Sequence, residues 1–277
     1  MNRGRSISLS FPPFTHWVKR IILACAGIYL LQVILEQASP SSYAYLMQYF
    51  GLSGAGVTHG FIWQLVTYSF LHGGLWHILL NMLTLWMFGS QEEQDWGSRR
   101  FLEFYFFCVI GAGLVTTAVS FTGFGMTPRT TTIGASGGIY GLLIAFGMLY
   151  GDRELFLFPI PFMIKAKYLV GILIFIVLIS TFQPSQGGVA NFAHLGGLFF
   201  GFLYLKLLPR RGITYATSEK YFGLRNSYYR WKRRRAAKKF EVYMRQHDRN
   251  VHFDEHGNYI PPDDDKKNGG SKSGWVN

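Results

Sequence analysis

The chain has 277 residues and a formal net charge of +12, yet only 15% of its residues are charged, well below the quarter or so typical of a soluble domain. Of its 27 lysines and arginines, 17 lie at or beyond Lys206 and 4 lie within the first 20 residues. This pattern, a long apolar segment between two basic ends, excludes an ordinary soluble domain and indicates a polytopic membrane protein.

The apolar segment divides into six predicted spans. After a polar and basic cytoplasmic N-terminal segment, residues 1–17, the first span covers about 18–37. Residues 38–73 contain no charged residue, and their aromatic side chains predict a long loop partly inserted at the membrane surface. The remaining predicted spans cover about 74–89, 101–121, 136–150, 168–182 and 189–208. The fold class is therefore an all-α membrane domain of six helices, residues 18–208. Cys25 and Cys108 lie in its apolar runs, which favours buried thiols over a disulfide framework.

The distribution of basic residues predicts the orientation. Six spans place both chain ends on one side, and 26 of the 27 lysines and arginines then fall on that side, with Arg129 opposite. Because basic loops of membrane proteins stay on the cytoplasmic side, both termini are predicted to be cytoplasmic. We expect a multi-pass protein of the bacterial inner membrane.

Residues 209–277 form a basic cytoplasmic tail. Residues 219–249 are strongly basic and aromatic and are expected to be helical, and the remainder is expected to be mostly disordered. Two interpretations stay open: a surface that binds anionic lipid, or a solvated tail that follows the charge rule. Nucleic acid is not expected as a partner.

A few polar side chains lie at membrane depth, and they gather at one level. They are His77 and Asn81 in the second span, Ser136 and Tyr140 in the fourth, and His194 in the sixth. All lie within the first two turns of spans that run from outside to inside. Since ionisable groups in spans are costly, a functional cluster is predicted just below the outer surface.

Ser136 begins an apolar helix inside the stretch TTTIGASGGIY, between Gly134 and Gly137. Backbone N–H groups at a helix start have no intrahelical acceptor, and the helix dipole favours negative charge there. Both features suit a developing oxyanion, and glycine permits close approach. The alternative is a glycine-rich helix start with an ordinary serine cap. A soluble nucleophile elbow is not expected, because no core strand precedes the serine.

Glycine pairs predict that the fourth and sixth spans pack closely. Gly137 and Gly141 lie four residues apart, as do Gly197 and Gly201, which share a helix face with His194. Small residues at this spacing allow membrane helices to touch backbone to backbone. The histidine is therefore expected to reach the serine.

The chemistry that follows is nucleophilic catalysis by a dyad. His194 would take the proton of Ser136, and no Asp or Glu at the same depth completes a triad. Tyr140 would pack against the imidazole. His77, Asn81 and the Ser136 backbone N–H would stabilise an oxyanion.

Structural roles are the competing interpretation. A single histidine in a span often only packs, and Tyr140 taken alone is a packing residue. Zinc held by His59, His72 and His194 is not expected, since no carboxylate or thiolate lies within reach. We predict no metal and no cofactor.

These motifs resemble the rhomboid family of intramembrane serine proteases. The resemblance covers about residues 15–208 and rests on GASG around Ser136, AHLGGLFFG around His194, HILLN with His77 and Asn81, and the upstream WQLVTYSFLHGG. The segment FGSQEEQDWGSRRF is similar to the family's glycine–glutamate–arginine pattern through Gly89, Glu93, Gly97 and Arg100.

The resemblance implies a nucleophile at Ser136, a general base at His194 and an oxyanion hole with His77 and Asn81. It also implies substrates that are membrane-spanning helices with helix-weakening residues, cut near their outer ends. One departure is Gln64, where the family often has arginine after the loop tryptophan, and it is expected to loosen that loop.

Two other classes of protein compete with the protease as interpretations of this sequence. A catalytically silent relative that binds membrane helices would have lost the serine or the histidine, and both are present. A transporter is disfavoured, because the sequence has no internal repeat and no charge at the bilayer midplane.

Overall fold

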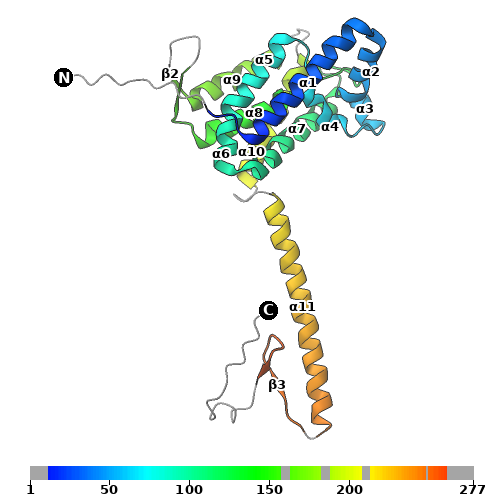
Figure 1. Ribbon diagram of the computed structural model, residues 1–277, viewed down its shortest axis with the longest axis vertical. Coiled ribbons are helices and arrows are strands. Elements are labelled where there is room, and N and C mark those ends of the chain that lie inside the picture. Colours follow the sequence, from blue (N-terminus) through cyan, green and yellow to red (C-terminus); the bar gives the residue numbers. More distant parts are fainter. Residues whose placement is uncertain (1–11, 157–162, 182–187, 208–212, 248, 261–277) are drawn as a thin grey trace, which may run out of the picture. The chain divides into compact units, whose positions relative to one another are not determined.

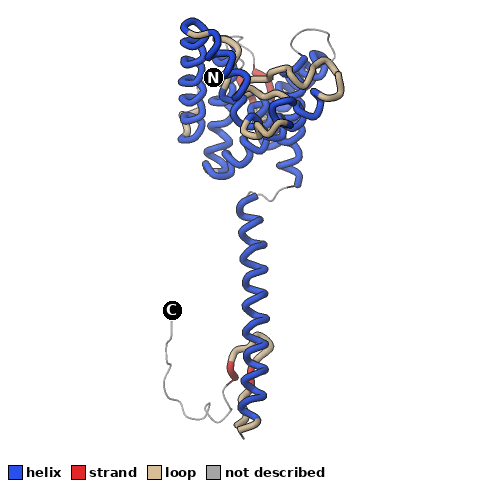
Figure 2. The backbone as a smooth tube through the Cα atoms, turned by 90° about the vertical axis from the view of Figure 1, so that its right-hand side faces the viewer, coloured by secondary structure: helices blue, strands red, loops and turns tan. Residues whose placement is uncertain are grey.

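The structure is a computed structural model that describes residues 12–156, 163–181, 188–207, 213–247 and 249–260. Helices make up most of these residues (Figures 1 and 2). The chain divides into two units, Met1–Gly212 and Ile213–Asn277.

The first unit begins with four helices and a 3₁₀ turn: α1 (His16–Ala38), α2 (Pro40–Phe50), α3 (Gly54–Thr58), α4 (Gln64–Thr67) and η1 (Tyr68–Phe70). The next group is α5 (Leu75–Thr84), a π-helical turn η2 (Leu85–Gly89), α6 (Ser90–Trp96), α7 (Ser98–Ser120) and α8 (Ser136–Leu149). The unit ends with strands β1 (Glu154–Phe156) and β2 (Met163–Lys165) and helices α9 (Ala166–Thr181) and α10 (Gly188–Leu207).

The six predicted spans correspond to α1, α5 with η2, α7, α8, α9 and α10. Among the described residues, α1 and α7 are long and apolar enough to cross a membrane by length and composition. Helix α8 and residues Ala166–Ile179 of α9 are apolar but shorter. The passage of all six helices through a membrane therefore stays a prediction.

The expected loop at residues 38–73 is not one irregular segment, because α2, α3, α4 and η1 lie in it. Pro40 starts α2, where its missing N–H costs nothing. The antiparallel pair β1–β2, within the loop predicted between the fourth and fifth spans, departs from an all-α fold.

Gln64 forms hydrogen bonds that hold this region together, and the expectation that it loosens the loop relative to an arginine stays a prediction. Its side chain is completely buried. The amide oxygen accepts from the N–H of Ser53 (3.1 Å), and the amide nitrogen donates to the carbonyl of Gln48 (2.8 Å). A neutral amide therefore links the end of α2 to the start of α3.

Helices α7, α8 and α10 pack against one another as the centre of the first unit (Figure 1). Close approach is possible because glycines lie at the contacts. A Cβ atom on Gly196 of α10 would lie 2.8 Å from the Cα of Ala112 in α7, and one on Gly111 of α7 would overlap the ring of Phe200. Larger residues would force these helices apart.

The second unit is a long helix with a small hairpin. Helix α11 (Ile213–Arg245) contains most of the basic segment, and β3 (His252–Phe253) pairs with β4 (Tyr259–Ile260). The backbone N–H of Phe253 donates to Glu241 (3.1 Å), which attaches the hairpin to α11. Residues 252–260 were expected to be mostly disordered, and this expectation is wrong for them. Residues 261–277 lie outside the described part of the chain.

The turn of this hairpin has a specific cause. The carboxylate of Asp254 accepts from the backbone N–H groups of His256 and Asn258, both at 2.8 Å. Gly257 has φ +80°, a conformation that favours glycine. The Asp254 hydrogen bonds and the Gly257 conformation involve residues within four positions of one another. This Asx-type turn can therefore close the hairpin without support from a large hydrophobic core.

Candidate active site

The loop before α8 is held in place from both ends. Thr132 exchanges two backbone hydrogen bonds with Leu52 (2.8 and 3.0 Å), and the N–H of Gly134 donates to the carbonyl of Tyr68 (2.9 Å). The buried hydroxyl of Tyr68 donates in turn to the carbonyl of Val109 in α7 (2.8 Å). The position of Ser136, the first residue of α8, thus depends on the outer loop and on α7 together.

Ser136 and His194 lie within hydrogen-bond distance of each other. The Oγ of Ser136 at the start of α8 is 2.8 Å from the Nε2 of His194 in α10. When Nε2 accepts the serine proton, the imidazole proton must be on Nδ1. That Nδ1 is buried and has no hydrogen-bond partner in the part of the chain that the structure describes. The pair is therefore a serine–histidine arrangement without a carboxylate bonded to the histidine.

Tyr140 lies one turn after Ser136, and its ring stacks on the imidazole of His194. The ring centroids are 4.3 Å apart and the planes are inclined by 20°. A stacked ring fixes the plane of the imidazole, which positions Nε2 toward the serine hydroxyl. It also presents an electron-rich face to a protonated imidazole.

Of the glycines predicted to join α8 and α10, only those of α10 face the other helix of the pair. A Cβ atom on Gly197 would overlap the carbonyl oxygen of Gly137, and one on Gly201 would lie 3.0 Å from the Cα of Gly141. The α10 glycines thus face the α8 backbone. The α8 glycines themselves face α7, since a Cβ on Gly141 would overlap Cys108. Helix α8 is therefore closely packed on two sides.

His77 reaches the same site from α5. Its Nε2 lies 2.8 Å from the position that a Cβ atom on Gly134 would take, and Gly134 has φ +124°. The N–H of Gly73 donates to the Nδ1 of His77 (3.2 Å), so the neutral ring carries its proton on Nε2. A hydrogen-bond donor is therefore directed toward the loop that precedes Ser136.

Asn81 is buried one turn after His77 on the same helix. Its side-chain nitrogen donates to the carbonyl of His77 (2.7 Å). That bond uses one of the two amide hydrogens, and the other stays available as a donor. Among the described contacts, none joins Asn81 to Ser136 or His194.

Two supports of the site were not predicted from the sequence: Gln32, and the contact of His72, which the sequence suggested only as a metal ligand. Gln32 in α1 is buried, and its side-chain amide forms two hydrogen bonds with the backbone of His72. The amide oxygen accepts from the His72 N–H (3.0 Å), and the amide nitrogen donates to the His72 carbonyl (3.2 Å). His72 packs edge-on against His77, with centroids 5.2 Å apart. A glutamine inside an apolar span was the available signal.

Within the described residues, no group of three or more His, Cys, Asp or Glu side chains lies close enough together to hold a metal ion. The exposed ring of His59 bonds to the carbonyl of Ala55 in its own helix (2.7 Å). The site that remains is a hydroxyl, an imidazole and nearby N–H donors.

Residues 59–211, more than half of the chain, match the family profile of the Rhomboid domain. The chain is also similar to Rhomboid protease GluP of Bacillus subtilis (strain 168), with 32% identity over 161 residues that cover 56% of this chain and 28% of that protein. RHOMBOID-like protein 1 of Arabidopsis thaliana is 33% identical over 149 residues, or 51% of this chain and 33% of that protein.

A longer stretch matches Rhomboid protein 1, mitochondrial, of Saccharomyces cerevisiae, with 28% identity over 205 residues that cover 70% of this chain and 55% of that protein. The chain thus spans about half of the yeast protein and a third or less of the other two.

Proposed function

Because the chain belongs to the rhomboid family of membrane proteins, we propose that it is an intramembrane serine endopeptidase that cleaves membrane-spanning helices near their outer ends. The observation that carries this proposal is the 2.8 Å separation between the Oγ of Ser136 and the Nε2 of His194. A serine hydroxyl is a weak nucleophile until a base within this reach takes its proton.

The proposed reaction has two steps. Ser136 attacks the carbonyl carbon of the scissile peptide bond while His194 takes the hydroxyl proton and passes it to the leaving amine. Water then attacks the acyl-enzyme while His194 takes a proton from it, and the bond between the acyl carbon and the Ser136 oxygen breaks as His194 returns that proton to the serine. The Tyr140 ring stabilises the imidazolium in place of a carboxylate.

Donors near Ser136 would stabilise the negative oxygen of each tetrahedral intermediate. The candidates are the Nε2–H of His77, the backbone N–H of Ser136 and the free amide hydrogen of Asn81. Each such donor is worth roughly 10²–10³ in rate. The start of α8 adds the favourable end of its dipole.

The substrate class follows from the needs of proteolysis in a membrane. The reaction requires water and an extended peptide, whereas a helix hides its carbonyls. A site near the outer ends of α5, α8 and α10 is wetted from the surface. We therefore expect substrates with helix-weakening residues and a small side chain at the cleavage site. This chain itself is expected to lie in the bacterial inner membrane with both of its termini in the cytoplasm.

The rival proposal is a silent relative that binds membrane helices without cutting them. The two are separated by measuring cleavage of a generic membrane-helix substrate by the purified protein. Ser136→Ala and His194→Ala should each abolish cleavage, leave thermal unfolding unchanged, and be no worse when combined. Near-normal turnover in either single variant would remove the dyad mechanism, and no cleavage by the wild-type protein would favour the rival.

We also propose that the basic tail binds anionic lipid. Support comes from Trp231, which is half exposed on α11 with the guanidinium of Arg235 over its ring at 5.3 Å. A fluorophore on Asn226→Cys, an exposed position of the same helix, should shift to the blue when the full chain is in nanodiscs with phosphatidylglycerol, and salt should reverse the shift. Cys25 and Cys108 are buried, so labelling is selective. The same spectrum with and without anionic lipid would support a solvated tail.

A further inference from the structure

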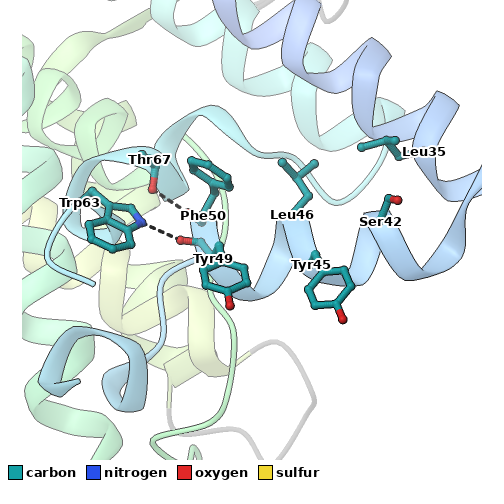
Figure 3. A pocket seen from close by; sticks show the side chains of 8 residues that line it. All are labelled: Leu35, Ser42, Tyr45, Leu46, Tyr49, Phe50, Trp63 and Thr67. Atoms are coloured by element: carbon teal, nitrogen blue, oxygen red, sulfur yellow. Dashed lines mark hydrogen bonds between the residues drawn. The ribbon is translucent and has the colours of Figure 1, made fainter. Parts of the chain in front are cut away.

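Helix α2 carries an apolar face that the described protein leaves open. The residues of this face are Ser42, Tyr45, Leu46, Tyr49 and Phe50. Their spacing of i, i+3, i+4, i+7 and i+8 is typical of a helix face that packs against other apolar groups. Yet α2 contains no buried residue. Together with Leu35, Trp63 and Thr67, this face lines a groove of about 470 Å³, drawn in Figure 3. We refer to it as the α2 groove.

The walls of the α2 groove are fixed by hydrogen bonds. The indole nitrogen of Trp63 donates to the carbonyl of Tyr49 (2.9 Å), and the hydroxyl of Thr67 donates to the carbonyl of Phe50 (2.8 Å) (Figure 3). These are carbonyls at the end of α2 that have no intrahelical donor. The groove is therefore preformed, and its nearest backbone acceptors are already used.

The chemistry of the α2 groove selects its occupant. Its surface is almost wholly apolar, and residues 38–73 include no charged side chain. An extended peptide would need backbone hydrogen bonds that the walls do not offer. A hydrocarbon chain needs none, and the volume lies in the range of small-molecule sites.

The two tyrosines of the groove resemble an interfacial anchor. Tyr45 and Tyr49 stack with centroids 6.4 Å apart, and Figure 3 shows their hydroxyl groups pointing to the same side. Tyrosines concentrate where a membrane meets water, with the ring in apolar surroundings and the hydroxyl in polar ones. Helix α2 follows directly after α1, a helix able to span a membrane, so it lies where a bilayer surface would be.

We propose that the α2 groove is a binding site for one acyl chain of a membrane lipid, with Tyr45 and Tyr49 at the level of its ester groups. Recognition is by the chain and not by the charge of the headgroup. Zwitterionic and anionic lipids therefore bind equally, and salt has no effect. This site is separate from the catalytic proposal, so a Ser136→Ala protein binds lipid in the same way.

The test is photo-crosslinking of the full chain in detergent with a phosphatidylcholine that carries a diazirine near the end of one acyl chain. Labelling should saturate at one lipid per chain and map to Leu35, Leu46 and Phe50. Ser42→Trp fills the open end of the groove and should reduce this labelling roughly tenfold, the factor expected from about two fewer buried methylenes.

Ser41→Trp is the matched control. Ser41 is an exposed neighbour on the same helix that does not line the groove, so this variant should label like the wild-type protein. Equal labelling of Ser42→Trp and wild type would overturn the proposal. So would labelling that requires phosphatidylglycerol or that falls with salt. Crosslinks from a membrane-helix substrate that displace the lipid from these residues would assign the groove to substrate instead.

Discussion

A side chain on Gly197 would overlap the carbonyl oxygen of Gly137, so α8 and α10 touch through their backbones beside the Ser136–His194 hydrogen bond. The same contact recurs one turn later, where Gly201 faces Gly141. The separation between hydroxyl and imidazole is therefore set by two glycine–glycine contacts, and none of these four glycines is proposed to take part in the chemistry.

Gly197→Val should lower the cleavage rate per folded enzyme by about 100-fold or more, because a displacement of about 1 Å in a catalytic pair costs that much. Rates are measured on a membrane-helix substrate, with folding checked by thermal unfolding. Gly27→Val in α1 makes the same change where no heavy atom lies within 4 Å, and it should be active. A fully folded and fully active Gly197→Val enzyme would show that this contact does not set the geometry.

His77→Ala should lower kcat by roughly 10²–10³ with little change in KM, since an oxyanion donor acts on the transition state. The donor role depends on the N–H of Gly73, which leaves the ring proton on Nε2. Trp76→Ala, at a neighbouring exposed position, is the control and should keep normal kcat. An unchanged kcat in His77→Ala would assign the oxyanion to other donors.

Tyr140→Phe should keep a cleavage rate within about twofold of wild type, whereas Tyr140→Ala should lose most of it. The reason is that the stacked ring, at 4.3 Å from the imidazole, orients His194 whether or not it carries a hydroxyl. The pair of variants is compared by kcat over a pH series. If Tyr140→Phe were as impaired as Tyr140→Ala, the hydroxyl and not the ring would be the functional part.

Glu93→Gln should destabilise the first unit, by about 1–3 kcal/mol at neutral pH. The carboxylate of Glu93 accepts from the backbone N–H groups of Trp17 (3.0 Å) and Val18 (3.1 Å) and from the hydroxyl of Ser98 (2.6 Å). It thereby caps the start of α1, where Thr15 provides no side-chain cap.

The pH dependence of this effect has a definite sign. Burial alone would raise the pKa of Glu93, but the hydrogen bonds from Ser98, Val18 and Trp17 outweigh it and lower the pKa. A lowered pKa means that the stabilisation is present above the unfolded pKa, about 4.3, and is lost as the pH falls through the folded value. Thermal unfolding should therefore converge for wild type and Glu93→Gln in acid. Glu36→Gln, at an exposed position, should not differ from wild type.

The helical stretches and the candidate pair could be located from hydropathy and residue spacing alone. Each apolar stretch satisfies its own backbone in a helix, so hydropathy and spacing locate α1, α7, α8 and α10 to within a few residues. Ser136 and His194 were identifiable because polar groups are rare at that depth. Their separation of 2.8 Å was not in the sequence, since the two residues lie 58 positions apart and their distance depends on glycine contacts between α8 and α10.

The residues that support the site could not be predicted from local patterns, because their partners are distant in the sequence. Glu93 caps a helix 76 residues away, and Gln32 brackets His72 across 40 residues. Gln64 stabilises the outer loop through hydrogen bonds to the backbone of Ser53 and Gln48, and the local sequence pattern does not predict these partners. Such bonds form where folding brings an unpaired backbone group next to a buried side chain. A one-dimensional pattern shows the polar residue, whereas its partner is set by the packing of the whole unit.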